Sequence, residues 1–134
     1  MNVIKLTETL GVSQQISPAS VAEIAAAGYR VLINNRPDGE EPNQPANDEI
    51  AAAAEAAGLE YYFLPITAMN FPGPDFELMC QLLADSTKPV LAFCRTGTRC
   101  TNLWVASQQG DARQQAAVQA RGLGYDLGMV SRLD

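Results

Sequence analysis

The segment from residue 88 to residue 107 constrains the fold more than any other part of this sequence. Residues 88–93 form a short apolar stretch that contains Pro89 near its start, and they predict a buried strand. Cys94 follows this stretch, and Gly97 provides a position where a tight turn can adopt a positive φ. From Thr98 to about residue 109 the sequence predicts a helix. A strand joined to a helix by so short a loop is typical of α/β proteins.

The rest of the chain repeats this alternation. Ser17 and Pro18 suit the cap and the first position of a helix. Alternating strands and helices predict an α/β fold, with a mainly parallel sheet that helices cover on both faces. We expect one domain spanning residues 1–134. The further strands are predicted at 3–6, 12–16, 29–34 and 60–66, and the further helices at 17–28, 45–57, 74–85, 110–121 and 125–133.

Composition excludes several classes of function. The chain contains no histidine, and its three scattered cysteines form no Cys-x-x-Cys pair, so we expect no metal and no cofactor. A formal charge of −6 argues against a nucleic acid partner. No apolar run approaches the roughly 20 residues that span a membrane, and residues 1–8 lack the layout of a signal peptide. With an odd number of cysteines, these features predict a cytoplasmic protein without a membrane partner.

The residues around Cys94 predict an anion-binding site with a reactive thiol. Backbone N–H groups converge where a strand turns into a helix, and the helix dipole favours negative charge there. A thiol at this point should have a lowered pKa and be nucleophilic near neutral pH. Arg95 and Arg99 add two positive charges that can hold an oxyanion through paired hydrogen bonds. In a parallel sheet, ligands bind at the carboxyl ends of strands, where loops 34–41, 67–75 and 94–99 are expected to meet.

The order of these elements resembles that of a known family. A helix precedes a strand that ends in Asn-Asn-Arg-Pro-Asp-Gly-Glu at 34–40, an alanine-rich helix and a further strand follow, and then comes the Cys94 loop. This order resembles the dual-specificity protein phosphatases. It is more similar still to the bacterial phosphatase-like domain named after beta-lactamase hydrolase-like proteins. The resemblance covers about residues 2–134 and implies a protein-tyrosine-phosphatase-like fold with a cysteine nucleophile.

The loop departs from the phosphatase pattern in its length. Phosphatases place their anion-binding arginine six positions after the cysteine, whereas Arg99 stands five positions after Cys94, and Phe93 replaces their usual histidine. The shorter loop resembles that of rhodanese-type sulfurtransferases, and a tighter ring should hold a phosphoryl group less easily. Thr101, in contrast, stands where phosphatases keep a hydroxyl that helps the thiolate leave. The fold and the loop therefore indicate different chemistries.

The resemblance to phosphatases implies a role for each residue of the site. Cys94 would form a phosphocysteine, Arg99 and the loop N–H groups would stabilise the transition state, and Asp75 would be the general acid. For that acid, Asp38 and Glu40 are the alternatives. The remaining residues expected to bind substrate are Arg95, Thr96, Gly97, Thr98, Thr101 and Arg36.

Several alternatives stay open at this point. Arg36 either braces the site or pairs with Glu40, and Cys100 is either a resolving thiol for Cys94 or a packed small residue. As a whole, the domain is a phosphatase with a phosphorylated substrate, or a sulfurtransferase that carries a Cys94 persulfide and takes a sulfur-containing substrate. A third reading is a non-catalytic anion-binding module.

Overall fold

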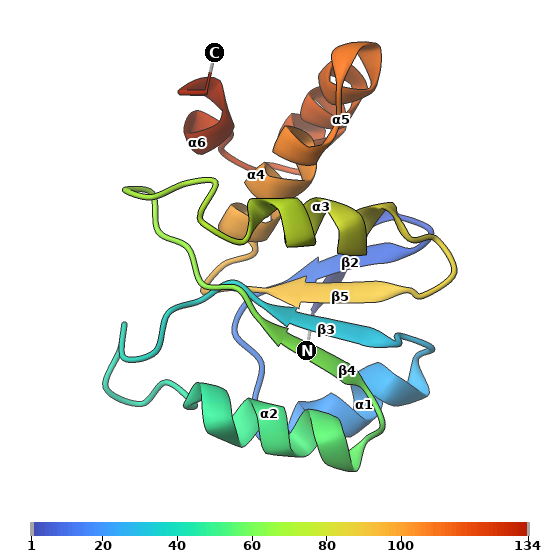
Figure 1. Cartoon of the computed structure of the whole chain (residues 1–134), viewed down its shortest axis with the longest axis vertical. Helices are drawn as coiled ribbons and strands as arrows, with labels where there is room; N and C mark the ends of the chain where they lie inside the picture. Colours follow the sequence, from blue (N-terminus) through green and yellow to red (C-terminus); the bar gives the residue numbers. More distant parts are fainter. Residues whose placement is uncertain (1, 134) are drawn as a thin grey trace.

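The computed structural model describes residues 2–133, which fold around a five-stranded sheet (Figure 1). The strands lie in the order β1-β2-β5-β3-β4, so β5, which leads into Cys94, is at the centre. β1 pairs with β2 in antiparallel orientation, and every other pairing is parallel. The strands are β1 Val3–Thr7, β2 Leu10–Ser13, β3 Val31–Asn34, β4 Glu60–Phe63 and β5 Val90–Phe93.

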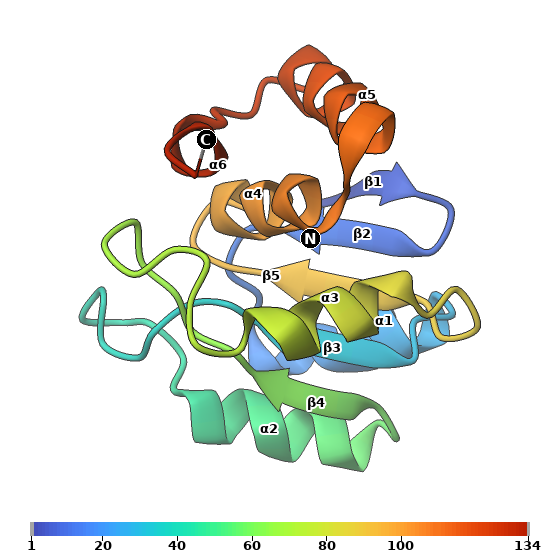
Figure 2. The ribbon, with the colours of Figure 1, turned by 45° about the horizontal axis from the view of Figure 1, so that its top comes forward.

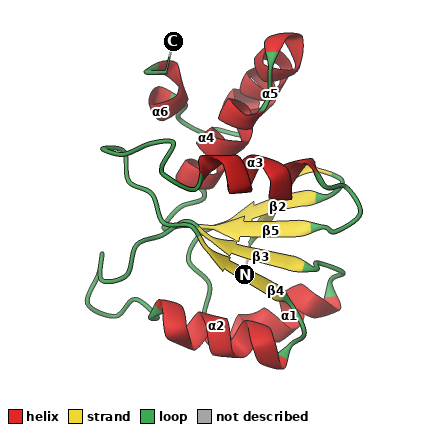
Figure 3. Cartoon of the chain, in the orientation of Figure 1, coloured by secondary structure: helices red, strands yellow, loops and turns green. Residues whose placement is uncertain are grey.

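Helices cover both faces of the sheet (Figures 1 and 3). One face carries the 3-10 helix η1 Pro18–Ser20 together with α1 Val21–Ala26 and α2 Asn47–Ala56. The opposite face carries α3 Phe76–Ala84 and α4 Thr98–Ser107, and α5 Gly110–Gly122 and α6 Gly128–Ser131 lie outside α4 (Figure 2). No helix among residues 2–133 is long and apolar enough to cross a membrane.

The side chains of β5 point alternately to the two faces of the sheet, and each face has its own hydrophobic core. Leu91 and Phe93 pack with the residues beneath α1 and α2, whereas Val90, Ala92 and Cys94 belong to the cluster beneath α3 and α4. Neighbouring side chains of a strand point to opposite faces, so the thiol of Cys94 points toward the α4 side. All four residues of β5 are buried, as expected for a central parallel strand.

The predicted α/β class, the mainly parallel sheet and the phosphatase-like fold are confirmed. The element bounds differ in places. The helix predicted over 17–28 begins as η1 because Ser17 caps the N–H of Ser20 in a tight turn before α1 starts. The strand predicted over 12–16 runs instead from Leu10 to Ser13, because this segment pairs with both β1 and β5. Gln15 lies beyond the end of β2 and donates its N–H to the carbonyl of Arg95.

Candidate active site

The loop after β5 places a ring of N–H groups around the sulfur of Cys94. The N–H of Gly97 donates to Cys94 Sγ at 3.1 Å, and the backbone N–H groups of Thr96, Arg99 and Cys100 lower the pKa of this thiol. α4 begins at Thr98, so the sulfur lies at the N-terminus of a ten-residue helix. Cys94 is fully buried. The loop is therefore built to hold negative charge at the sulfur.

Gly97 is required by the shape of this turn. It has a φ of +87° and caps α4. A Cβ at this position would lie 3.3 Å from the hydroxyl of Tyr125 and 3.6 Å from the carbonyl of Ser13. A larger residue would thus be strained in its backbone and crowded by its neighbours. The prediction of a positive φ at Gly97 is confirmed.

Cys100 has a role that neither reading of the sequence included. Its thiol donates a hydrogen bond to Cys94, and this bond is the largest of the effects that lower the pKa of Cys94 to about 6. The N–H groups of Cys100, Thr96 and Arg99 act in the same direction, whereas burial opposes them. Burial, followed by the hydrogen bond to Cys94, raises the pKa of Cys100 itself well above that of a free thiol. Cys94 is thus the thiolate of the pair, and Cys100 keeps its proton.

Arg99 joins the three loops at the carboxyl ends of the strands. Its Nη1 donates to Glu40 Oε2 at 2.9 Å and to the carbonyl of Ile66 at 3.0 Å, and its Nη2 donates to Glu40 Oε1 at 2.8 Å. Glu40 lies in the loop after β3, and Ile66 lies beyond the end of β4. The structure therefore brings these loops together, as the strand order predicts.

Arg36 pairs with two acidic residues and with Gln15. Its Nε donates to Glu40 Oε1 at 2.9 Å, its Nη1 to Gln15 Oε1 at 3.0 Å and its Nη2 to Glu41 Oε1 at 3.1 Å. The residue is 2% exposed, so the charge is buried, and each of its three guanidinium nitrogens has an acceptor. The predicted pairing of Arg36 with Glu40 is confirmed, and its role in bracing the site stays a prediction.

The other predicted binding residues shape the loop. Arg95 is exposed, and its Nε pairs with Glu41 Oε1 at 2.8 Å. Thr96 Oγ1 donates to Thr98 Oγ1 at 3.0 Å. The hydroxyl of Thr101 is buried and donates to the carbonyl of Gly97 at 2.8 Å, so it supports the turn from below.

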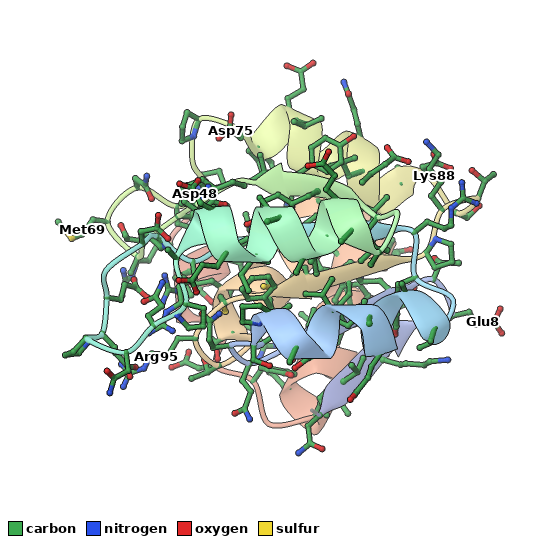
Figure 4. All side chains as sticks on the ribbon, turned by 90° about the horizontal axis from the view of Figure 1, so that it is seen from below. Glu8, Asp48, Met69, Asp75, Lys88 and Arg95 are labelled. Atoms are coloured by element: carbon green, nitrogen blue, oxygen red, sulfur yellow. The ribbon has the colours of Figure 1, made fainter. Side chains whose placement is uncertain are left out.

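The three carboxylates considered as the general acid occupy different environments. Asp75 is exposed at the start of α3, and Figure 4 shows it well apart from Arg95. Asp38 Oδ1 accepts the N–H of Asn47 at 2.7 Å, at the first turn of α2. The hydrogen bond from Arg99 is the main reason that the pKa of Glu40 is lowered, with Arg36 acting in the same direction. A carboxylate with a lowered pKa is a poor proton donor at neutral pH.

Comparison with known proteins shows which family this chain resembles. The family model described as "Beta-lactamase hydrolase-like protein, phosphatase-like domain" matches residues 2–112. A beta-lactamase hydrolase-like protein of Xylella fastidiosa (strain Temecula1) is 39% identical over 131 residues. That match covers 96% of this chain and 30% of the relative, so the chain spans about a third of the relative's length.

Solved structures show the same relationship. A crystal structure from Neisseria meningitidis Z2491, described as that of a candidate phosphatase, is 36% identical and covers 100% of this chain and 97% of its own, with a TM-score of 0.79. Kinase-associated phosphatase shares the fold alone: its identity is 13%, the match covers 98% of this chain and 89% of its own, and the TM-score is 0.77. The chain therefore belongs to the family of phosphatase-like domains named after the beta-lactamase hydrolase-like proteins.

Proposed function

We propose that this domain is a cysteine-dependent phosphatase whose nucleophile is the Cys94 thiolate. The observation that carries the proposal is the ring of N–H groups around a buried sulfur whose pKa is lowered to about 6. A thiolate at that pKa is the main form at neutral pH, and a site that stabilises a negative sulfur also suits the oxygens of a phosphoryl group. Membership of a phosphatase-like family supports the same reaction class.

The reaction has two steps. In the first, Cys94 attacks phosphorus, an S–P bond forms, and the bond from phosphorus to the ester oxygen breaks. The leaving oxygen takes a proton from an acid or departs as an anion. In the second, water attacks the phosphocysteine, releases inorganic phosphate and restores the thiolate. Arg99 and the loop N–H groups stabilise the charge on the phosphoryl oxygens in both steps.

The position of Asp75 bears on the substrate class. The family resemblance makes Asp75 the acid, yet its carboxylate is exposed and has no hydrogen bond to residues 94–99. A leaving group that is already a weak base gains little from protonation. We therefore expect aryl phosphates, which release a phenolate, to be better substrates than alkyl phosphates.

The loop length supports a second candidate, sulfur transfer. Arg99 stands five positions after Cys94, and this tight ring suits a small target. In that reaction the Cys94 thiolate takes the outer sulfur of thiosulfate, and sulfite leaves. An acceptor such as cyanide then attacks the outer sulfur of the persulfide, thiocyanate leaves, and the thiolate is restored. No acid is needed for either step.

Phosphate release from an aryl phosphate tests the proposal. The purified protein should release phosphate, Cys94→Ser should not, and both should remain folded by circular dichroism. An active Cys94→Ser protein would exclude the covalent mechanism. If the wild-type protein binds an oxyanion but turns over neither the aryl phosphate nor thiosulfate, the domain is a non-catalytic anion-binding module.

A further inference from the structure

Glu40 occupies one edge of the Arg99 guanidinium and leaves the other free. Two bonds to Glu40 and one to the carbonyl of Ile66 use three of the five N–H hydrogens of Arg99. The Nε–H and the second hydrogen of Nη2 have no acceptor among residues 2–133. These two hydrogens lie on one side of the guanidinium and match two oxygens of a phosphoryl group. Glu40 thus determines which edge of Arg99 is available.

Glu40 is itself held in place. Its Oε1 accepts a bond from the buried Arg36 at 2.9 Å, and its backbone N–H donates to Gln44 Oε1 at 3.0 Å. Arg36 is fixed in turn by Gln15 on the opposite side. Together with Glu41 and Arg95, which pair with each other, the network holds three arginines and two carboxylates and so carries one net positive charge. The Glu40 carboxylate is therefore a rigid support for Arg99 within the structure.

The position of Arg99 in the loop makes this support relevant. Arg99 is the second residue of α4, one position earlier than the arginine of a usual phosphatase loop. One residue along a helix turns the side-chain direction by about 100°. The hydrogen bonds to Glu40 and to the carbonyl of Ile66 hold the Arg99 guanidinium in its position.

We propose that Glu40 is the positioning residue for Arg99, and that it lets a loop with the shorter spacing present its arginine to an oxyanion. The inference rests on the proposed function, because it requires that Arg99 bind the substrate oxyanion. It also assigns Glu40 a role other than general acid, which agrees with its two arginine partners.

Glu40→Gln tests the inference, with Glu41→Gln as the matched control. Both variants remove one carboxylate from the same loop, and both glutamates bond Arg36, but only Glu40 bonds Arg99. We expect Glu40→Gln to lower kcat/KM for an aryl phosphate by about 10- to 100-fold, since small displacements of a catalytic group have effects of this size. Glu41→Gln should have a much smaller effect. Glu40→Asp, which keeps the charge, should recover part of the loss.

A double-mutant cycle separates positioning from a general structural role. If Glu40 acts through the fork of Arg99, Glu40→Gln should cost little once Arg99→Lys has removed that fork. An equal cost in both backgrounds, or equal effects of Glu40→Gln and Glu41→Gln, would overturn the inference. Where Glu40→Gln fails to fold, Glu40→Asp replaces it in the same cycle.

Inorganic phosphate binding, measured by calorimetry, tests the positioning role of Glu40 separately from the proposed phosphatase function. Wild type that binds phosphate and a folded Glu40→Gln that binds it equally well would overturn the positioning role alone. Wild type that neither binds phosphate nor hydrolyses an aryl phosphate would overturn the proposed function and this inference together. Weaker phosphate binding by Glu40→Gln than by Glu41→Gln is the result we expect.

Discussion

Replacing Cys100 by alanine should raise the pKa of Cys94 without changing the fold. The Cys94 pKa of about 6 lies well below the value of roughly 8.5 for a free thiol. The thiol of Cys100 makes the largest contribution to that difference, and alanine removes it while the loop N–H groups stay. A hydrogen bond to a charged group contributes about 1.5–3 kcal/mol, which corresponds to about 1–2 pKa units. We therefore expect a Cys94 pKa of about 7–8 in Cys100→Ala.

This change has consequences for both activity and stability. At pH 7 the thiolate fraction should fall from about 90% to between about 10% and 50%. The acidic limb of the activity profile should move upward by the same 1–2 units, roughly. Because folding lowers the pKa of Cys94, its contribution to stability is complete above roughly pH 8.5 and is lost as the pH falls through about 6. In Cys100→Ala this contribution should be smaller, and its loss should be complete at a higher pH, because the folded pKa lies closer to that of a free thiol.

The ultraviolet absorbance of the thiolate, followed against pH, measures this pKa directly. Cys94→Ser supplies the background from the other thiols. Cys100→Ser is the matched control, since its hydroxyl can still donate and should keep much of the shift. If Cys94 still titrates near 6 in a folded Cys100→Ala protein, the thiol of Cys100 is not the principal donor, and the reasoning is refuted.

Three further predictions concern the roles of single residues. Cys94→Ser should abolish turnover but keep inorganic phosphate binding by calorimetry, because the N–H ring and Arg99 remain; lost binding in a folded variant would contradict this. Asp75→Asn should lower aryl phosphate turnover by less than about 10-fold, whereas loss of a general acid in contact with substrate costs about 100-fold or more. Inserting one residue between Thr98 and Arg99 should reduce turnover in a folded protein, since it rotates Arg99 about 100° away from Glu40; a gain would show that the usual spacing works better here.

Local sequence patterns were sufficient to predict the fold. The apolar run of 88–93 and the residues of β3 indicate buried parallel strands, and β5 and β3 are buried throughout. Strand ends were less predictable. β4 ends at Phe63 although its predicted range extends to 66, because its partner β3 ends at Asn34. Beyond that point, Leu64 and Ile66 bond single carbonyls after the regular ladder has ended.

The site was predicted only as far as local chemistry extends. Cys94, Gly97 and Arg99 lie within one short segment, and their residue types indicate an anion loop. Glu40 and Arg99, in contrast, are 59 positions apart, and only the meeting of two loops joins them. The donor role of Cys100 was missed because the direction of its side chain depends on where α4 begins. No local sequence pattern predicts the contact of Glu40 with Arg99 or that of Cys100 with Cys94.

The covalent state of Cys94 during turnover distinguishes phosphoryl transfer from sulfur transfer. The protein is mixed with an aryl phosphate, quenched in acid within one turnover, and analysed by mass spectrometry at Cys94; a second sample receives thiosulfate in place of the phosphate. We expect a phosphoryl group on Cys94 in the first sample, and none in Cys94→Ser. An unmodified Cys94 after the aryl phosphate, together with a persulfide after thiosulfate, would refute the phosphatase proposal.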